Sequence, residues 1–271
     1  MKQKSDKISA VISSFDGFSD CWEPMIDSLL KFWPKNFFNI YLITNYLDSP
    51  NEQLIPSIKV GRDKGWASNL KYALERIDTK YVIYLQEDFW FTKKINLYKL
   101  LEIISFTTIN KIDYFRLVPI PPSDQKSTEY GLTTKTSKYR CCLQASLWKK
   151  SFLEALLIDG ENGWDFEVET STRINQFFPN ALTYSVNSNY LMRYCEGTAI
   201  RKNRWTNEAI SIIKSNNYNI NIKERGNESK IEIYLLKLSS RSLYLKIISF
   251  FLLRLILILK GKFNIKNLFK I

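Results

Sequence analysis

Short apolar segments alternate with amphipathic helical segments along the first 90 residues of the chain. Residues 21–33 and 68–77 carry apolar side chains at helical spacing, which predicts two helices. The β-branched apolar segments predict four strands: KISAVISSF (7–15), FNIYLITN (38–45), residues 58–63 and YVIYL (81–85). The resulting order, β-α-β-β-α-β, predicts an α/β fold with a Rossmann-like, mostly parallel central sheet flanked by helices.

Polar residues stand at or just beyond the ends of the expected strands: Asp16, Asn45, Asp63 and the pair Glu87-Asp88. Because ligands bind beyond the carboxyl ends of parallel strands, we expect these side chains to gather along one edge. Adjacent carboxylates repel each other unless a cation relieves the repulsion, and Mg²⁺ or Mn²⁺ prefers such oxygen ligands. The alternative is a strand end whose acidic side chains are simply solvated.

The chain of 271 residues contains no histidine. Its four cysteines, none at metal-ligand spacing, are Cys21, Cys141, Cys142 and Cys195. This composition excludes zinc sites and catalysis that depends on histidine. We expect Cys141 and Cys142 to be small core residues. The first residues lack an apolar signal core, so we expect a cytoplasmic protein with reduced thiols.

The positive charge is concentrated at the end of the chain. Residues 241–271 contribute seven of the net twelve positive charges and no acidic residue, which argues against a basic face for nucleic acid. Residues 242–259 are strongly apolar but contain Lys246 and Arg254, so an amphipathic helix on an anionic membrane surface fits better than a transmembrane helix. We therefore expect a catalytic domain over 1–225 and a basic, hydrophobic helical membrane-association segment over 226–271. The alternative for the tail is a helix packed on the domain.

The middle of the chain is less regular than its beginning. Residues 112–124 are expected as a strand that runs into a proline-rich loop, and residues 139–157 as a strand and a helix. Residues 160–176 are expected as a turn and the start of a helix, and residues 193–205 as a loop with clustered basic side chains. Trp90 and Trp148 are expected in the core. Arg116 and Arg140 are expected either to bind acceptor or phosphate or to form structural ion pairs.

Five segments occur in a characteristic order: SSFDGF (13–18), GRDKGWASNLKYAL (61–74), YVIYLQEDFW (81–90), SLWKKSFL (146–153) and GWDFEVE (163–169). Over about residues 7 to 210 this order resembles the GT-A glycosyltransferases, specifically the family-2-like bacterial enzymes that build surface polysaccharides. In that family, YVIYLQEDFW stands at the place of an Asp-X-Asp motif, and GWDFEVE at the place of an acceptor-side acid. The chain departs from the motif at Gln86, where the family has an aspartate; Asp88 matches the last acid, and Glu87 is a substitute for the first.

The resemblance implies transfer of a sugar from a nucleotide sugar to a glycan or lipid-linked acceptor, in lipopolysaccharide or capsule synthesis at the inner face of the membrane. It implies a divalent metal, Mn²⁺ or Mg²⁺, held by Asp88 and Glu87. The donor-binding residues that it implies are Asp16, Arg62, Asp63, Asn69 and Glu87, with Arg201, Lys202 and Arg204 on the diphosphate beside Trp205 as a hinge or lid contact. The alternative for the basic residues is a solvated surface.

The family resemblance also implies a carboxylate general base, for which Asp165 and Glu167 are both candidates. Trp164 and Phe166 flank Asp165, and aromatic walls bind sugar faces and raise a carboxylate pKa by desolvation. The alternative is a helix N-terminus whose acids are favoured by the macrodipole. A single base and direct displacement, as in the family, would invert the anomeric centre.

Two other classes of function compete with this interpretation. A nucleotidyltransferase also uses an α/β sheet and a carboxylate-bound metal, but we would expect a glycine-rich phosphate loop near the N-terminus, and SSFDGF (13–18) is poor in glycine. The second alternative is a non-catalytic membrane-associated binding protein, in which the polar strand ends are incidental.

Overall fold

The computed structural model describes residues 8–34, 38–124, 129–188 and 191–228. The chain divides into two compact units, Met1–Ala199 and Ile200–Ile271. The segment 226–271, which we expect to associate with a membrane, lies almost entirely outside the described residues. The expected boundary at residue 225 therefore stays a prediction.

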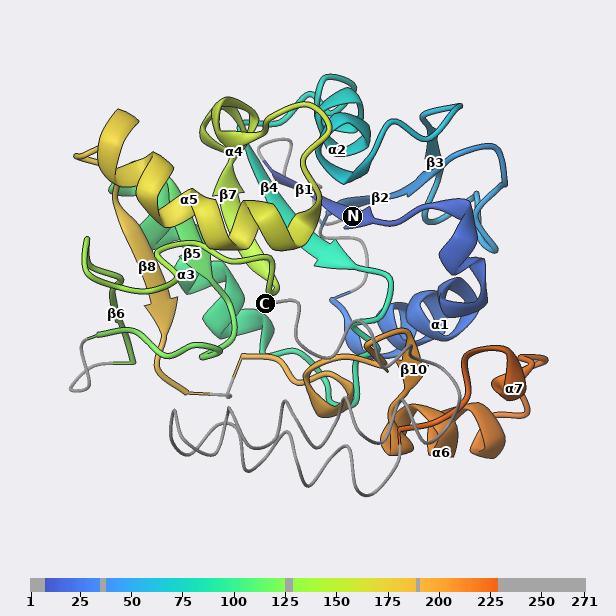
Figure 1. Cartoon of the computed structure of the whole chain (residues 1–271). Helices are drawn as coiled ribbons and strands as arrows, with labels where there is room; N and C mark the ends of the chain where they lie inside the picture. Colours follow the sequence, from blue (N-terminus) through green and yellow to red (C-terminus); the bar gives the residue numbers. More distant parts are fainter. Residues whose placement is uncertain (1–7, 35–37, 125–128, 189–190, 229–271) are drawn as a thin grey trace, which may run out of the picture. The chain divides into compact units, whose positions relative to one another are not determined.

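A mixed sheet forms the centre of the first unit, with eight strands in its described part and the order β3-β2-β1-β4-β7-β5-β8-β6 (Figure 1). The strands are β1 (Ile8–Ser13), β2 (Asn39–Thr44), β3 (Ser57–Lys59), β4 (Tyr81–Gln86), β5 (Tyr114–Arg116), β6 (Tyr130–Leu132), β7 (Ser146–Lys149) and β8 (Thr183–Val186). β1 to β4 are mutually parallel, whereas β7 and β6 run antiparallel to their neighbours. The predicted α/β class with a mostly parallel central sheet flanked by helices is confirmed.

Five α-helices and two 3₁₀ turns accompany the sheet in the described part of the first unit: η1 (Asp16–Cys21), α1 (Trp22–Phe32), α2 (Trp66–Leu74), α3 (Leu97–Ile109), α4 (Lys150–Leu156), α5 (Gly163–Phe177) and η2 (Cys195–Gly197). The helices expected over 21–33 and 68–77 are confirmed as α1 and α2. α1 forms because Trp22, Met25, Ile26 and Leu29 lie on one buried stripe, and it ends just before Pro34.

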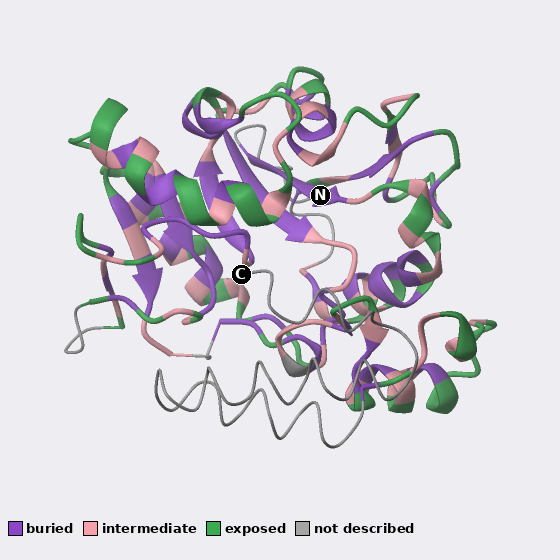
Figure 2. Ribbon diagram, in the orientation of Figure 1, coloured by how far each residue is buried: buried purple, intermediate pink, exposed green. Residues whose placement is uncertain are grey.

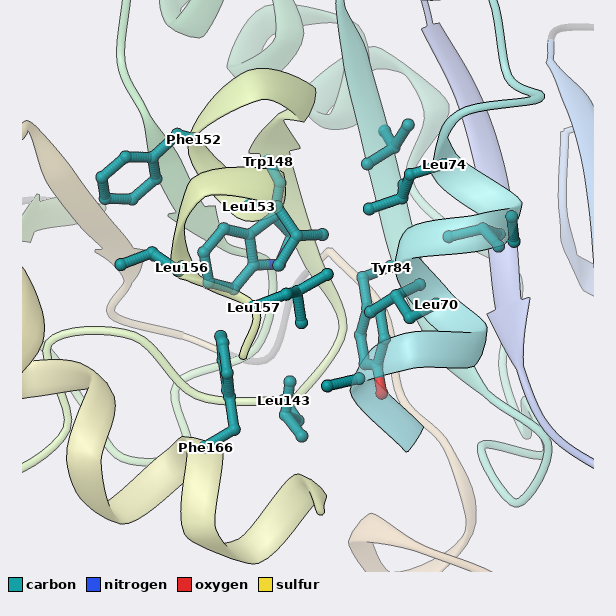
Figure 3. Close-up of a cluster of buried hydrophobic side chains, with 14 of the residues drawn as sticks. Leu70, Leu74, Tyr84, Leu143, Trp148, Phe152, Leu153, Leu156, Leu157 and Phe166 are labelled. Carbon is teal, nitrogen blue, oxygen red and sulfur yellow. The ribbon is translucent and has the colours of Figure 1, made fainter. Parts of the chain in front are cut away.

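One face of the sheet is covered by α2, α4 and α5, which bury a continuous apolar cluster against it (Figure 3). Tyr84 and Trp148 enter this cluster from the sheet, and Phe166 enters it from α5; all three side chains are fully buried. Figure 2 shows the resulting pattern, with buried strands and helices exposed on their outer sides. Trp90, Cys141 and Cys142 are also buried, which confirms their predicted places in the core.

The second unit contains a small hairpin and two short helices in its described part: β9 (Ile200–Arg201), β10 (Arg204–Trp205), α6 (Asn207–Ser215) and α7 (Ile222–Arg225). Residues 193–205 were expected to be a loop, and this interpretation is wrong for the hairpin. Its turn places Lys202 and Asn203 at φ of 50° and 59°, the left-handed region in which two-residue hairpin turns of this hand lie. Thr206 begins α6 by accepting a hydrogen bond from the Ala209 N–H at 3.3 Å.

Across the described ranges, no helix has the length and apolar character needed to cross a membrane. The apolar stretch 242–259 lies outside those ranges.

Candidate functional site

The carboxyl ends of β1, β2, β3 and β4 lie at one edge of the sheet because these strands are parallel and adjacent. Ser13 at the end of β1 pairs with Gln86 at the end of β4, and Thr44 of β2 pairs with Lys59 of β3. The residues that follow these strands are therefore brought together from separate parts of the sequence. We call this region the carboxyl edge.

Asp16 lies three residues beyond the last residue of β1, at the start of η1, because the strand ends at Ser13 and not at Phe15 as expected. One of its carboxylate oxygens accepts the N–H of Asn45 at 2.8 Å, and the other accepts those of Tyr46 at 2.9 Å and Leu47 at 3.2 Å. The side-chain oxygen of Asn45 in turn accepts the Asp16 N–H at 3.1 Å. The side-chain amide of Asn45 donates to the Gly61 carbonyl at 3.0 Å. The turns after β1, β2 and β3 are thus joined by one hydrogen-bonded network.

Asp63 and Asn69 lie together in the segment between β3 and α2. The Oδ1 atom of Asp63 accepts the Asn69 side-chain amide at 2.7 Å and the Gly65 N–H at 2.8 Å. Arg62 is exposed. Asn69 also lines a surface pocket of about 450 Å³. The other residues that line it are Val60, Lys64, Ser68, Lys71, Tyr72, Glu75 and Asp159.

The end of β4 carries Gln86, Glu87 and Asp88, all half-buried. The Gln86 amide donates to the Tyr84 hydroxyl at 3.0 Å, and the Trp66 indole N–H donates to the same hydroxyl at 3.2 Å. Burial raises the pKa of Tyr84 well above its ordinary value, so this phenol remains neutral. Gln86 therefore takes part in a neutral network that reaches the start of α2.

Asp88 is tied to the segment that ends the first unit. Its carboxylate accepts a hydrogen bond from the Thr198 hydroxyl, and its carbonyl accepts the Ala199 N–H at 2.7 Å. Glu87, one residue earlier, accepts the Trp90 indole N–H on its carbonyl at 3.1 Å. Since Trp90 is fully buried, its indole fixes the backbone that carries both carboxylates.

The two candidate bases lie on different sides of α5. Asp165 is exposed, and its carboxylate accepts the side-chain amide of Asn162, the N-cap residue of the helix, at 2.7 Å. Glu167 is half-buried, and its Oε1 accepts the backbone N–H of Leu143 at 2.7 Å. Burial raises the pKa of Glu167, while the Leu143 N–H and the positive charge of Arg116 oppose that rise. Of the two carboxylates, Glu167 is the more buried.

The beginning of α5 lies close to both α2 and the segment before β7. The Ala67 N–H of α2 donates to the Glu161 carbonyl at 3.1 Å, and the Trp66 and Phe166 rings are 5.1 Å apart. A Cβ on Gly163 would meet a methyl group of Leu143 at 3.0 Å, so glycine permits this close approach. α5 consequently carries Glu167 to the side of the sheet on which Trp66 contacts Tyr84.

Tyr194 contacts both the segment before β7 and the residue that follows Asp88. Its hydroxyl donates to the Gln144 side-chain oxygen at 2.6 Å, and its ring stacks on Phe89 with 4.4 Å between centroids. Burial raises the pKa of Tyr194, and the negative charge of Asp88 raises it further. Gln144 directly follows Leu143, the residue that holds Glu167. Thr198, Tyr194 and Gln144 were missed by the sequence analysis because no local pattern distinguishes them.

The two arginines whose role was left open are buried and bound largely to carbonyl groups. The Arg116 guanidinium donates to the Tyr114 hydroxyl at 3.1 Å, to the Tyr139 carbonyl at 2.7 Å and to the Pro121 carbonyl. Arg140 donates to the Asn175 side-chain oxygen at 2.8 Å and to the Ala181 carbonyl at 2.7 Å. Neither guanidinium forms an ion pair with another described residue, so the expected structural ion pairs are not found. Arg116 also places positive charge near Glu167.

The basic residues predicted for the diphosphate belong to the second unit. Arg201 forms an ion pair with the buried Glu228, with a distance of 2.9 Å between Nη1 and Oε1. Lys202 is exposed at the turn of the hairpin, and Arg204 is half-buried in β10. Trp205 is fully buried, and the Arg225 guanidinium lies 5.6 Å from its ring centroid. The role of these residues toward a donor stays a prediction.

The donor set at the end of β4 fits a divalent metal shared with a substrate. No group of three acidic, histidine or cysteine side chains suited to a metal occurs within the described ranges. Magnesium and manganese sites on nucleotides nevertheless need only one or two protein carboxylates, because phosphate oxygens and water complete the coordination. Asp88 and Glu87 offer such hard oxygen atoms at a half-buried edge.

No family model and no curated protein matches the sequence. The structure is similar to that of TarS residues 1–349 from S. aureus, with 10% identity over 81% of this chain and 68% of that one, and a TM-score of 0.49. It is similar to the mannosyltransferase PcManGT from Pyrobaculum calidifontis, solved with GDP-Man and Mn²⁺, with 12% identity over 74% and 59% of the chains and a TM-score of 0.48. A cytidylyltransferase from Leptospira borgpetersenii has 10% identity over 65% and 73%, with a TM-score of 0.40.

Proposed function

We propose that this protein is a glycosyltransferase that moves a sugar from a nucleotide-sugar donor to a glycan or lipid-linked acceptor of a bacterial surface polysaccharide. The observation that carries the proposal is the half-buried Glu167, whose pKa is raised and whose Oε1 accepts the Leu143 N–H, in the same unit as the carboxyl edge, where Glu87 and Asp88 directly follow β4. The order of sequence motifs, which resembles the GT-A glycosyltransferases, supports the same function. We therefore assign a donor side to this edge and an acceptor side to the beginning of α5.

The donor side is assigned to the carboxyl edge of β1 to β4. Asp88 and Glu87 would hold the metal, which neutralises charge on the leaving diphosphate when it is bound. The network of Asp16 and Asn45 fixes the turns against which a nucleoside would lie, and the Asp63–Asn69 pair orders the neighbouring segment with Arg62. Arg201, Lys202 and Arg204 are proposed as further cations for the diphosphate.

The acceptor side is assigned to the beginning of α5. An acceptor hydroxyl oxygen attacks the anomeric carbon while the bond from that carbon to the diphosphate oxygen breaks, and the hydroxyl proton passes to Glu167. The Oε1 atom of Glu167 already accepts the Leu143 N–H, so the proton would go to Oε2. A raised pKa suits this role because a general base works best when its pKa lies near the working pH. A single displacement of this kind inverts the anomeric centre.

The first test is thermal stabilisation of the full chain by UDP, GDP, CMP and dTDP, each with Mn²⁺, Mg²⁺ or EDTA. A ligand that binds the folded state raises the melting temperature by mass action. We expect one nucleotide to stabilise the wild type in the presence of metal and to lose this effect in Asp88→Asn. Stabilisation that persists in EDTA would shift diphosphate neutralisation to the basic residues. No response to any nucleotide would refute the donor site.

A second measurement separates glycosyl transfer from nucleotidyl transfer. A glycosyltransferase releases a nucleoside diphosphate or monophosphate from a nucleotide sugar, whereas a nucleotidyltransferase releases pyrophosphate from a nucleoside triphosphate. We expect slow, Glu167-dependent release of nucleotide from one nucleotide sugar and no pyrophosphate from triphosphates with sugar phosphates. Pyrophosphate release would overturn the proposed reaction while leaving the nucleotide site in place.

Peripheral attachment to the inner face of the membrane is also part of the proposal, and the basic tail of residues 241–271 supports it. Co-sedimentation of the full chain with anionic phosphatidylglycerol vesicles tests it against neutral phosphatidylcholine vesicles. Replacement of Lys260, Lys262, Lys266 and Lys270 by glutamine should weaken binding to the anionic vesicles.

A further inference from the structure

Trp164 is the most exposed of the large apolar side chains that the structure describes, with 80% of its surface accessible. Its neighbour Phe166 is fully buried, so the two aromatic residues of this segment have opposite environments. An indole has a large flat apolar surface that a ligand can cover. Trp164 therefore contributes little to the packing of α5, and its indole is accessible to a ligand.

The backbone that carries Trp164 is already ordered. The side-chain oxygen of Asn162 accepts the Trp164 N–H at 2.9 Å and the Asp165 N–H at 3.0 Å, which caps the first turn of α5. Tryptophan has only two rotatable side-chain bonds, so a ligand that covers the indole costs the protein little conformational entropy. An exposed indole on a capped helix end is a preorganised flat surface.

Trp164 and Glu167 are neighbours on the surface of α5, because residues three apart in a helix lie on one face with about 5 to 6 Å between their Cβ atoms. The Glu167 carboxylate contacts the Leu143 N–H and is half-buried, whereas the neighbouring Trp164 indole is exposed. A ring that lies on the Trp164 indole would thus bring its polar substituents within reach of the Glu167 carboxylate.

The acidic residues around Trp164 limit the class of ligand that can bind to its indole. Asp165, Glu167 and Glu169 all lie within five residues of it on α5, and Asp165 and Glu169 are exposed. A phosphate-rich ligand or an anionic membrane surface would be repelled by this cluster. A neutral pyranose ring combines an apolar face of C–H groups, which can cover the indole, with hydroxyl groups that can donate to a carboxylate.

We infer that Trp164 is the platform on which the ring of a neutral acceptor sugar lies, with one hydroxyl directed at Glu167. The inference rests on the proposed function for the role of Glu167 as the base, and it names the acceptor as a pyranose rather than a lipid or protein hydroxyl. Trp164 contacts the substrate and sets its position; it takes no part in proton transfer.

The test uses saturation-transfer NMR on the full chain with glucose, galactose, mannose, N-acetylglucosamine and N-acetylgalactosamine, each as its methyl β- or α-glycoside. We expect at least one glycoside to receive saturation, most strongly at the C–H protons of one ring face. Trp164→Ala should weaken its binding by roughly 3- to 10-fold, the range for one aromatic contact, and Trp164→Phe should restore part of the binding. Tyr98→Ala is the matched control, because Tyr98 is 79% exposed on α3.

The outcomes separate this inference from the proposed function. Nucleotide-dependent stabilisation should be unchanged in Trp164→Ala, since Trp164 belongs to the acceptor side. Loss of sugar binding in Trp164→Ala would support the platform even if no nucleotide bound the wild type, in which case the transferase proposal alone would fail. If no glycoside binds the wild type, or if Trp164→Ala binds it as well as the wild type does, the inference is overturned and the nucleotide result stands by itself.

Discussion

The Oε1 atom of Glu167 on α5 accepts the backbone N–H of Leu143 at 2.7 Å, so a carboxylate is held against the segment that leads into β7. The next residue, Gln144, accepts the Tyr194 hydroxyl, and the pKa of Tyr194 responds to the charge of Asp88. Leu143 thus holds Glu167, the proposed base, and its neighbour Gln144 binds the tyrosine whose pKa responds to Asp88, the proposed metal ligand.

Replacement of Glu167 by glutamine tests its role as the base. Glutamine keeps the carbonyl oxygen that can accept the Leu143 N–H but cannot take a proton from an acceptor. We expect kcat to fall by roughly 10² to 10⁴, with nucleotide binding unchanged, as measured by single-turnover transfer and by thermal shift. Asp165→Asn is the matched control, because Asp165 lies on the same helix but is exposed and contacts Asn162. If Asp165→Asn were the more damaging substitution, Asp165 would be the base.

The raised pKa of Glu167 also predicts a pH dependence of stability. Burial raises the pKa of its carboxyl in the folded protein above the ordinary 4.5, so the folded state holds this proton more tightly than the unfolded chain does. The stability that this proton contributes is fully present below pH 4.5 and is lost as the pH rises through the raised pKa.

Glu167→Gln removes this titration. We therefore expect the free energy of unfolding of Glu167→Gln, relative to wild type, to increase as the pH rises from 4.5 through the raised pKa of Glu167. Urea denaturation at several pH values measures the difference. A difference that stays constant over this range would mean that the carboxyl has the same pKa in the folded and unfolded states.

Asp16 offers a test of the network that joins the turns of the carboxyl edge. Its carboxylate accepts three backbone N–H groups, of Asn45, Tyr46 and Leu47, and Asp16→Ala leaves all three without this acceptor. We expect the free energy of unfolding to fall by about 2 to 4 kcal/mol, since hydrogen bonds to a charged group are worth about 1.5 to 3 kcal/mol and water replaces some of them.

Asp78→Ala serves as the control for this substitution because Asp78 is exposed. Chemical denaturation measures both variants. If Asp16→Ala were as stable as Asp78→Ala, the network would add nothing to stability. The proposed role of Asp16 would then be ligand binding alone.

Local sequence patterns were sufficient for several regular elements of the first unit, but α3, β6 and β8 were not predicted. The strands over 8–13 and 81–86 and the helix α1 follow from β-branched content and helical spacing, which act within a few residues. The hairpin of the second unit was missed because its turn uses Lys202 and Asn203 at positive φ, where a glycine would have revealed it. The strand expected at the start of residues 139–157 is shorter than predicted, because β7 begins only at Ser146. The segment from Tyr139 to Ala145 is irregular.

The site was predicted only as far as topology constrains it. Parallel strands bring Asp16 and Asn45 together, and the sequence order of the strands was enough to expect this. The choice between Asp165 and Glu167 depends on which side of α5 faces the sheet, and that is decided by contacts with distant residues such as Leu143. Thr198 is 110 residues from Asp88, and no local pattern predicts such a contact.

The contact between Thr198 and Asp88 yields the last prediction. The Thr198 hydroxyl donates to the Asp88 carboxylate, and the adjacent Ala199 N–H donates to the Asp88 carbonyl, so Asp88 is held through both its side chain and its backbone. Thr198→Val keeps the shape of the side chain but removes the donor. We expect the free energy of unfolding to fall by about 1.5 to 3 kcal/mol, the value for a hydrogen bond to a charged group.

Thr198→Ser retains the hydroxyl and serves as the matched control, with a smaller loss of stability that reflects the missing methyl group.

The same pair of variants tests whether Asp88 binds a metal. If Asp88 binds a divalent ion with the donor, its carboxylate must exchange the Thr198 hydroxyl for the metal, at least in part. Thr198→Val should then leave metal-dependent stabilisation by the nucleotide equal to or greater than that of the wild type, as measured by thermal shift. Loss of that stabilisation in Thr198→Val, with Thr198→Ser unaffected, would instead make the hydroxyl part of the donor site, acting together with Asp88.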